Sequence, residues 1–234
     1  MITPDRVIEK ELLSGFSDDG EPIYLAGVDE VGRGALAGPA SVGIALVSVN
    51  TTDDFPVGLR DSKLMSAPAR EAMVTPVRSW VAASAVGHSL VDEVNEFGIM
   101  GALRAAAARA LAQLDGYRIG GILLDGSHNW WASDGLFEVG PRLPQIPVRT
   151  EVKGDARCAV VAAASVLAKV ERDALMIDLA QKYPGYDWEK NKGYAAKAHI
   201  AGLARLGATP VHRTSWNLPG LAEFNARKES HARG

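Results

Sequence analysis

Short apolar segments rich in β-branched residues alternate along this chain with longer segments rich in Ala, Leu and Arg. The short segments predict strands and the long ones predict helices, because their composition and apolar repeats are typical of those structures. The order strand, strand, helix, strand, helix, strand, strand, helix, helix predicts an α/β domain with a mixed sheet and a helical C-terminal extension. The predicted strands are 24–28, 40–49, 81–90, 119–124 and 148–152, and the predicted helices are 67–80, 92–114, 155–183 and 196–206.

Local signals refine these elements. Ser66 has the residue type and position of an N-cap for the first predicted helix. Gly98 or Gly101 is expected to interrupt the second helix, because glycine is a poor helix former. The segment 126–147 is rich in Gly, Pro, Ser and Asn, and its pattern predicts no particular structure.

Length and composition limit the possible classes of protein. A chain of 234 residues, of which 47% are hydrophobic, can bury one substantial core, or one core and a small subdomain. The single cysteine, Cys158, excludes an intramolecular disulfide and is expected to be a small buried side chain. Residues 1–10 are charged and lack the apolar stretch of a secretory signal, and no segment has the roughly 18 uninterrupted apolar residues of a membrane span. We therefore expect a cytoplasmic protein.

Acidic residues stand at the ends of separated elements. Asp29 and Glu30 directly follow the first predicted strand, Asp125 directly follows the fourth, and Asp155 begins a helix. Taken singly, Asp125 can be a turn residue, Asp155 a helix cap and Glu30 a solvated charge. Taken together, they can converge at one edge of the sheet, where two Mg²⁺ ions about 3.5–4 Å apart would neutralise them and support an in-line displacement. The spacing alone leaves both interpretations open.

The acidic pair Asp29-Glu30 is followed at once by the turn Gly32-Arg33-Gly34. Because carboxylates repel phosphates, an acidic pair beside a cationic glycine turn indicates divalent cations between the acids and a phosphodiester. Neighbouring side chains on a regular strand point to opposite faces, so both acids can face one pair of ions only if the strand bends or ends. We therefore expect the strand to break its alternation at Glu30, which the glycines permit.

Charge is distributed unevenly along the chain, whose net charge is -3. Residues 181–234 contain nine Lys or Arg and four Asp or Glu, so this part is basic and residues 1–180 are acidic. A chance fluctuation of surface charge is the simple explanation. The alternative is a basic face that meets phosphates while the body of the protein supplies acidic metal ligands.

Six short motifs follow one another along the chain: Gly27-Val28-Asp29-Glu30-Val31-Gly32-Arg33-Gly34, Asp61-Ser62-Lys63, Leu124-Asp125-Gly126, Lys153-Gly154-Asp155, the run from Ala162 to Asp173, and Asn191-Lys192-Gly193-Tyr194. In this order they resemble the motifs of the ribonuclease HII family, the type 2 ribonucleases H, over about residues 24–216. Each motif is modest evidence, but six in one order are specific.

The resemblance implies a ribonuclease H-like fold, with a mixed five-stranded sheet flanked by helices. It also implies an endonuclease that hydrolyses the RNA strand of RNA/DNA hybrids and incises DNA 5′ of an embedded ribonucleotide, during replication and repair. The products would carry 3′-hydroxyl and 5′-phosphate ends. By this resemblance Asp29, Glu30, Asp125 and Asp155 are the catalytic acids, and they hold two Mg²⁺ or Mn²⁺ ions.

The resemblance also implies substrate contacts. The Gly32-Arg33-Gly34 turn matches one that reads the ribose 2′-hydroxyl, the group that distinguishes RNA from DNA, and the adjacent phosphate. Tyr194 matches a tyrosine that packs on the deoxyribose 3′ of the ribonucleotide; a core or rim tyrosine is the alternative. Ser62 and Lys63 are expected to bind phosphate, although a loop lysine is often simply solvated.

Further residues match less specific parts of the family pattern. Ser165, Lys169 and Asp173 lie about one helical turn apart, and we expect them to pack and orient the site. His212-Arg213 resembles a His-Arg pair near the C-terminus of the family, whereas Ala195-Ala196 departs from the usual residues there.

These observations predict three regions: a catalytic domain at 1–180, a helical substrate-binding extension at 181–220 and a mobile polar tail at 221–234. The expected partners are RNA/DNA hybrids and duplex DNA containing ribonucleotides, with a monomeric enzyme and a possible replication-clamp contact through the tail. Two alternatives remain. A protein that only binds hybrids would not need four acids, and a nuclease or recombinase acting on DNA alone would not need the 2′-hydroxyl-reading turn or Tyr194.

Overall fold

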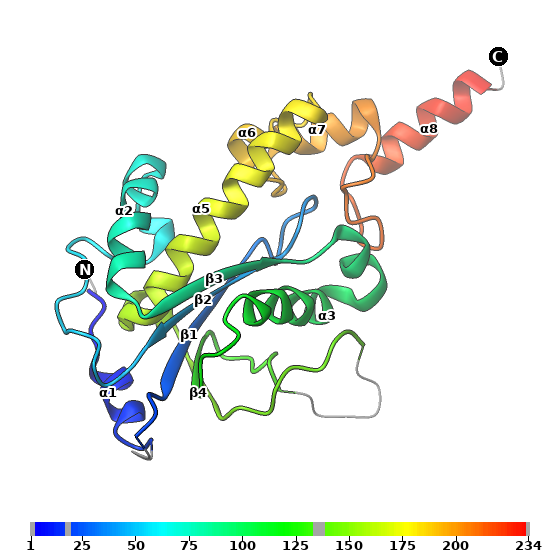
Figure 1. The fold of residues 1–234 in the computed structure, drawn as a ribbon. Coiled ribbons are helices and arrows are strands. Elements are labelled where there is room, and N and C mark those ends of the chain that lie inside the picture. Colours follow the sequence, from blue (N-terminus) through cyan, green and yellow to red (C-terminus); the bar gives the residue numbers. More distant parts are fainter. Residues whose placement is uncertain (1–2, 17–19, 133–138, 233–234) are drawn as a thin grey trace.

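The computed structural model describes residues 3–16, 20–132 and 139–232, and these build one mixed sheet covered by helices (Figure 1). The strands are β1 (Tyr24–Val31), β2 (Ser41–Val47), β3 (Ala83–His88), β4 (Ile119–Asp125) and β5 (Val148–Glu151). Their order in the sheet is β3-β2-β1-β4-β5. The pairs β1–β2 and β2–β3 are antiparallel, and β1–β4 and β4–β5 are parallel. The five strands predicted from the sequence are confirmed.

The helices confirm the main predictions and add elements that the sequence did not reveal. They are α1 (Val7–Leu13), α2 (Ala67–Trp80), α3 (Val91–Ala112), α4 (Gly154–Arg157), α5 (Ala159–Lys182), α6 (Trp188–Asn191), α7 (Lys197–Leu206) and α8 (Leu221–Ala232), with a 3-10 turn at Ser62–Leu64. Ser66 caps α2 by accepting a hydrogen bond from the Ala69 N–H, and Gly98 interrupts α3 with a φ of 67°. Within the described residues, no helix is long and apolar enough to cross a membrane.

The helix predicted to start at Asp155 is two helices, so that detail of the prediction was wrong. Cys158 separates α4 from α5 in an extended conformation, and it forms a β-bridge with Asp5 near the N-terminus. The buried carboxylate of Glu9 accepts a hydrogen bond of 2.7 Å from the Val160 N–H and so caps α5. Cys158 is buried, as expected. The N-terminal segment therefore fixes where α5 begins.

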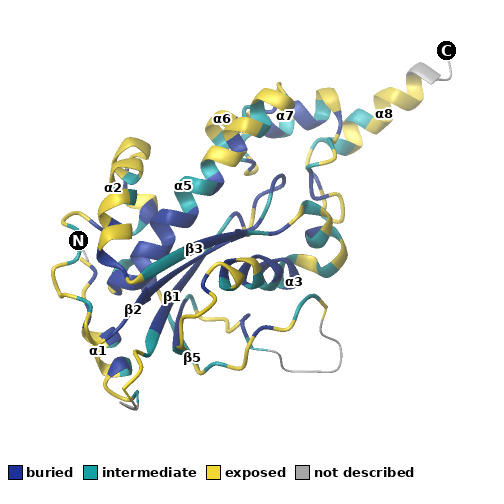
Figure 2. Cartoon of the chain, in the orientation of Figure 1, coloured by how far each residue is buried: buried dark blue, intermediate teal, exposed yellow. Residues whose placement is uncertain are grey.

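Two hydrophobic cores lie on the two faces of the sheet. The first lies between the sheet and α5, α2 and α1, and the second lies between the sheet and α3 (Figures 1 and 2). Helix α5 comes unusually close to the strands because Gly27 and Gly43 have no side chains. A Cβ atom on Gly27 would lie 2.6 Å from the carbonyl carbon of Val160, and one on Gly43 would lie 2.3 Å from the carbonyl oxygen of Ala164. These two close approaches set the distance between α5 and the strands β1 and β2.

A third cluster joins the C-terminal part of the chain to the second half of α5. It contains Tyr186, Trp188 and Leu203, packed on Met176 of α5 and on Leu36 of the loop after β1. The cluster contains residues from before and after position 180, the predicted boundary between the catalytic domain and the C-terminal extension. A separate substrate-binding extension therefore remains a proposal.

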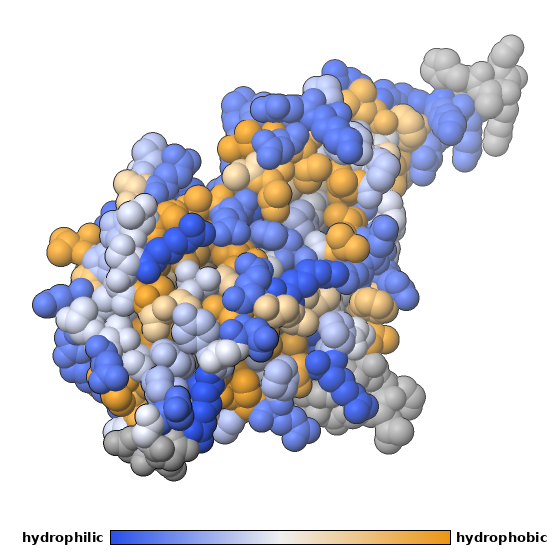
Figure 3. All heavy atoms as spheres, viewed as in Figure 1, coloured by the Kyte–Doolittle hydropathy of each residue, from blue (hydrophilic) through white to orange (hydrophobic). Residues whose placement is uncertain are grey.

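The segment predicted as a mobile tail, 221–234, forms α8 up to Ala232, and residues 233–234 lie outside the described residues. Helix α8 projects from the rest of the molecule and has a mostly hydrophilic surface (Figures 1 and 3). Phe224 anchors its first turns beside Gly207 at the end of α7. The helical pattern was missed because the segment is polar and gains its apolar contact only from α7.

The close approach of α5 predicts the effect of a small substitution. Gly43→Ala is expected to lower the free energy of unfolding by about 1–3 kcal/mol, because the new methyl group overlaps the backbone of α5. Urea unfolding measures this change. The matched control is Gly15→Ala, whose Cβ would meet only the Leu12 carbonyl oxygen at 3.5 Å and should change stability by less than about 0.5 kcal/mol. Equal stability of both variants would contradict the proposed close contact.

Candidate active site

The acids predicted from the sequence lie at neighbouring ends of the central strands. Asp29 is near the end of β1, and Asp125 is the last residue of the parallel neighbour β4. Asp155 begins α4, and its N–H donates to Asp125 Oδ1 over 3.4 Å. The charges of Asp125 and Asp155 both act on Asp29. The fold therefore brings these three carboxylates together although they belong to three separate elements.

The predicted break of alternation at Glu30 was wrong. Strand β1 continues to Val31, and its pairing with β2 is regular through Asp29 opposite Gly43 and Glu30 opposite Val42. Asp29 consequently points toward α5, where it bonds Ser165, and Glu30 points toward the α3 face. Pairing between β1 and β4 ends at Val28. At Asp29 and Glu30, β1 therefore no longer pairs with β4, and its pairing with β2 keeps it a regular strand.

Glu30 is held by two side chains from different directions. Trp130 Nε1 donates to its Oε2 over 3.2 Å, and Arg33 Nη1 donates to its Oε1 over 3.2 Å. Trp130 is buried, and Arg104 of α3 donates to its carbonyl oxygen. The sequence analysis missed Trp130 because the segment 126–147, of which 133–138 lie outside the described residues, gave no pattern. The Trp130-Trp131 pair in a polar segment was the available signal.

Asp29 is buried and is oriented by a chain of hydroxyl groups. Its Oδ1 accepts a hydrogen bond of 2.9 Å from the Glu30 N–H, and the Ser165 side chain also bonds this carboxylate. Ser165 Oγ lies 2.9 Å from the buried Ser62 Oγ. The predicted phosphate contact of Ser62 stays a prediction, while its hydroxyl has an evident role in supporting Asp29.

The shared environment raises the pKa of three of the acids. Burial raises the pKa of Asp29 well above its ordinary value, and the charge of Asp125 adds to this. Burial also raises the pKa of Asp125 and of Asp155, and for Asp155 the neighbouring Asp125 charge is the second cause. The cluster thus carries more negative charge than the protein readily stabilises.

Lys63 supplies a cation to this cluster. Its Nζ lies 3.1 Å from Asp155 Oδ2, while the lysine side chain is 71% exposed. Burial lowers the pKa of Lys63, but the charges of Asp155 and Asp29 outweigh that effect and raise the pKa above its ordinary value. An exposed, flexible ammonium in this position can leave when another cation takes its place.

The donor set fits a hard divalent cation. Carboxylate oxygens are the ligands that Mg²⁺ prefers and that also suit Mn²⁺. In the described part of the chain, no three acidic, histidine or cysteine side chains already converge as a finished metal site. The raised pKa values of the three acids and the ammonium of Lys63 beside Asp155 indicate that positive charge is favourable at this position. Asp29, Glu30, Asp125 and Asp155 would hold it.

The turn after β1 is fixed by two buried arginines. Arg213 donates to the carbonyl oxygens of Gly32, Arg33 and Gly38, at 2.6 Å, 2.9 Å and 3.1 Å. Arg172 of α5 donates to those of Ala37, Pro39 and Lys192. Both guanidinium groups are fully buried, and neither forms an ion pair with a described acid. The sequence signal for Arg172 was a charged residue on an otherwise apolar helix face.

In this turn the two arginines bond only carbonyl oxygens and leave the backbone N–H groups to other partners. Its carbonyl groups face the arginines, and within the described residues the N–H groups of Arg33 and Gly34 have no hydrogen-bond partner. Gly32 has a φ of 81°, and a Cβ there would lie 2.0 Å from Arg172 Nε, so this position requires glycine. Tyr194, which is 37% exposed, accepts a hydrogen bond from the Gly32 N–H over 3.1 Å. The predicted substrate residues at 32–34 and 194 are therefore adjacent.

A sheet ordered β3-β2-β1-β4-β5, with acids at neighbouring ends of β1 and β4, defines a nuclease domain of the ribonuclease H class. The sequence model for "Ribonuclease HII" matches residues 26–218. The chain therefore belongs to the ribonuclease HII family, and it is an endoribonuclease and a hydrolase. Enzymes of this family depend on divalent metal ions and act on RNA/DNA hybrids.

Individual relatives agree with this assignment. Ribonuclease HII from Streptomyces avermitilis is 42% identical over 192 residues, which are 82% of this chain and 76% of that protein. The crystal structure of ribonuclease H2 from Pyrococcus horikoshii OT3 matches with a TM-score of 0.65 at 25% identity, over 88% of this chain and all of that one. RNase HII from Archaeoglobus fulgidus, solved in a complex with PCNA, shares the fold with a TM-score of 0.62 at 22% identity, over 82% of this chain and 93% of that one.

The crowding of acids predicts a gain in stability when one charge is removed. Without divalent ions, Asp29→Asn is expected to raise the free energy of unfolding by about 1 kcal/mol at pH 7. The pKa of Asp29 is higher in the folded than in the unfolded protein, so ionisation above the ordinary value of 3.8 destabilises the fold. The gain should vanish below that pH, where the carboxyl is protonated in both states.

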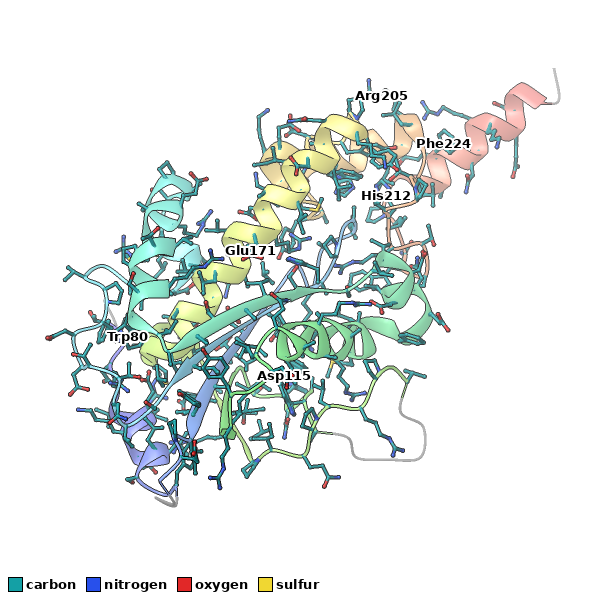
Figure 4. All side chains as sticks on the ribbon, in the orientation of Figure 1. Trp80, Asp115, Glu171, Arg205, His212 and Phe224 are labelled. Carbon is teal, nitrogen blue, oxygen red and sulfur yellow. The ribbon has the colours of Figure 1, made fainter. Side chains whose placement is uncertain are left out.

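Thermal unfolding in the presence of a chelator measures this effect. Asp115→Asn, at an exposed acid after α3, is the matched control and should melt like the wild type (Figure 4). A lower melting temperature for Asp29→Asn at pH 7 would show that the Asp29 charge is well compensated without metal ions.

Proposed function

We propose that this ribonuclease HII cuts the RNA strand of RNA/DNA hybrids and also incises duplex DNA 5′ of an embedded ribonucleotide, leaving 3′-hydroxyl and 5′-phosphate ends. The observation that supports this most is the direct link between the acids and the Gly32-Arg33-Gly34 turn, made by the ion pair between Arg33 and Glu30. Groups suited to recognise a ribose lie beside groups suited to hydrolyse its phosphodiester. This arrangement fits removal of ribonucleotides in replication and repair.

The chemistry follows from the acids and their neighbours. Two Mg²⁺ or Mn²⁺ ions, held by Asp29, Glu30, Asp125 and Asp155, would supply an activated water and charge neutralisation at the leaving oxygen. The Ser62–Ser165 hydroxyl chain orients Asp29, and Trp130 orients Glu30. Lys63 leaves Asp155 and contacts a substrate phosphate.

Substrate recognition uses the backbone N–H groups of the turn after β1. The N–H groups of Arg33 and Gly34 are suited to oxygen atoms of the ribonucleotide, and the Arg33 guanidinium is suited to the adjacent phosphate. The ring of Tyr194 packs on the deoxyribose 3′ of the ribonucleotide, where a 2′-hydroxyl fits poorly. The hydrogen bond from the Gly32 N–H to the Tyr194 hydroxyl connects the turn to the tyrosine that makes the second contact.

The remaining proposals concern partners and regions. Residues 1–180 form the catalytic domain, 181–220 support substrate binding, and the protein acts as a cytoplasmic monomer. A clamp contact through 221–234 would use α8, which projects into solvent. The Archaeoglobus fulgidus relative was solved with PCNA, and that observation makes a clamp the partner to test for this chain.

The carboxylate assignment predicts a selective loss of activity. Asp125→Asn should reduce cleavage of a duplex with one ribonucleotide by more than about 100-fold, since even groups that only support metal ligands contribute about 10–100-fold. The measurement is the initial rate with Mg²⁺ or Mn²⁺ on three labelled duplexes: one with a single ribonucleotide, one RNA/DNA hybrid and one all-DNA.

Asp115→Asn is again the control and should cleave like the wild type. Cleavage of the all-DNA duplex would support a DNA nuclease instead, and binding without any cleavage would support a hybrid-binding protein. Normal rates for a folded Asp125→Asn protein would refute the proposed site.

The proposed phosphate contact of Lys63 predicts a change in salt dependence. The logarithm of substrate affinity should fall linearly with the logarithm of salt concentration, and Lys63→Ala should reduce the slope by about 1. Fluorescence anisotropy in the Asp125→Asn background measures binding without cleavage. Lys10→Ala is the control, because Lys10 pairs with Asp53 beside α1 and should leave the slope unchanged.

A further inference from the structure

Two buried histidines connect the C-terminal part of the chain to Tyr194. His199 lies in α7 and His212 lies in the segment between α7 and α8 (Figure 4). Both side chains are fully buried, and their Nε2 atoms are 3.1 Å apart. They pack against the aromatic rings of Tyr186 and Trp188. Neither histidine is among the acids or the turn described above.

The neighbours of this pair fix where its protons lie. The Thr209 N–H can only donate, and it points at His212 Nδ1 over 2.9 Å. Neutral His212 must then carry its proton on Nε2, which donates to His199 Nε2. His199 must therefore carry its proton on Nδ1, which lies 3.0 Å from the carbonyl oxygen of Tyr194, an atom that can only accept. The Trp188 N–H also points at His199 Nε2, so a proton there is excluded.

Burial keeps both rings uncharged. It lowers the pKa of His199 below its ordinary value, and together with the neighbouring His199 it lowers the pKa of His212 to about 4. A second proton on either ring would meet a fixed donor, Trp188 or Thr209. At neutral pH the pair is thus a single chain of directed hydrogen bonds, from the Thr209 N–H to the Tyr194 carbonyl.

The same pair is attached to the turn that carries the proposed substrate contacts. The backbone of His212 forms a β-bridge with Ala37, and the Arg213 N–H donates to the Leu36 carbonyl over 2.9 Å. At the other end of the chain, the Tyr194 hydroxyl accepts from the Gly32 N–H. The contacts form a closed loop that begins and ends on the segment 32–37. Movement of either histidine would shift Tyr194 relative to the turn.

We propose that His199 and His212 form a tautomer-locked pair whose role is to position Tyr194 against the Gly32-Arg33-Gly34 turn, and thereby to favour a deoxyribose 3′ of the cleaved ribonucleotide. They are positioning residues, since neither touches the reacting atoms. This inference rests on the proposed function of Tyr194. It adds two residues that set the choice between single ribonucleotides and continuous RNA.

Two substitutions at one position separate positioning from general stability. In His199→Asn the amide nitrogen stands near the place of Nδ1 and can still donate to Tyr194, whereas in His199→Gln the amide stands near Nε2 and the bond to Tyr194 is lost. Both variants remove the same aromatic ring. The Ala196 N–H also donates to the Tyr194 carbonyl, so the residue stays ordered in both.

The measured quantity is the ratio of kcat/KM for a single-ribonucleotide duplex to that for an RNA/DNA hybrid. His199→Gln should lower this ratio about fivefold, the effect of one typical hydrogen bond, and His199→Asn should change it by less than about twofold. Equal ratios in two variants with equal melting temperatures would overturn the proposal. A wild-type enzyme that cuts neither duplex would refute the proposed function instead.

A second measurement needs no variant and no activity. Two-bond ¹H–¹⁵N correlation spectra of the wild-type protein at pH 7 distinguish the tautomers of each histidine. We expect the Nδ1–H form for His199 and the Nε2–H form for His212. An Nε2–H form of His199, or a charged ring at either position, would overturn the inference even if the variants fail to fold.

Discussion

The close packing of α5 on the glycine-lined part of β1 and β2 is the constraint on which the site depends. Gly27 and Gly43 let the helix backbone approach the strands, and Glu9 fixes where the helix begins. From that position α5 places Ser165 beside Asp29 and Arg172 beside the turn after β1. One helix therefore sets the distance between the acids and the groups proposed to read the substrate.

Charges of like sign gather at two places along that helix, the acids near Ser165 and the arginines near Arg172. Burial and neighbouring carboxylates raise the pKa of Asp29, and Arg172 and Arg213 lie buried close together without an ion pair to any acid in the described part of the chain. Carbonyl oxygens of the turn satisfy the guanidinium groups, and Lys63 partly neutralises the acids. The two buried arginines are thus satisfied by the protein itself, whereas the acids keep raised pKa values even with Lys63 beside them.

Much of this arrangement could be predicted from the sequence, because it rests on local patterns. The five strands, the Ser66 cap and the interruption at Gly98 follow from residue type and periodicity. The predicted break at Glu30 failed because an isolated strand was considered, whereas β2 holds β1 regular to Val31. Helix α8 was missed because its apolar contact belongs to another helix.

The sequence by itself determined which acids and glycines occur, in what order, and hence the ribonuclease HII family. Only the tertiary structure decided how they are held. Trp130 reaches Glu30 across 100 residues of chain, and Arg213 reaches Gly32 across 181. The tautomers of the His199–His212 pair likewise depend on donors fixed by packing. Such contacts arise from three-dimensional closeness and polar satisfaction in the interior, and no local pattern encodes them.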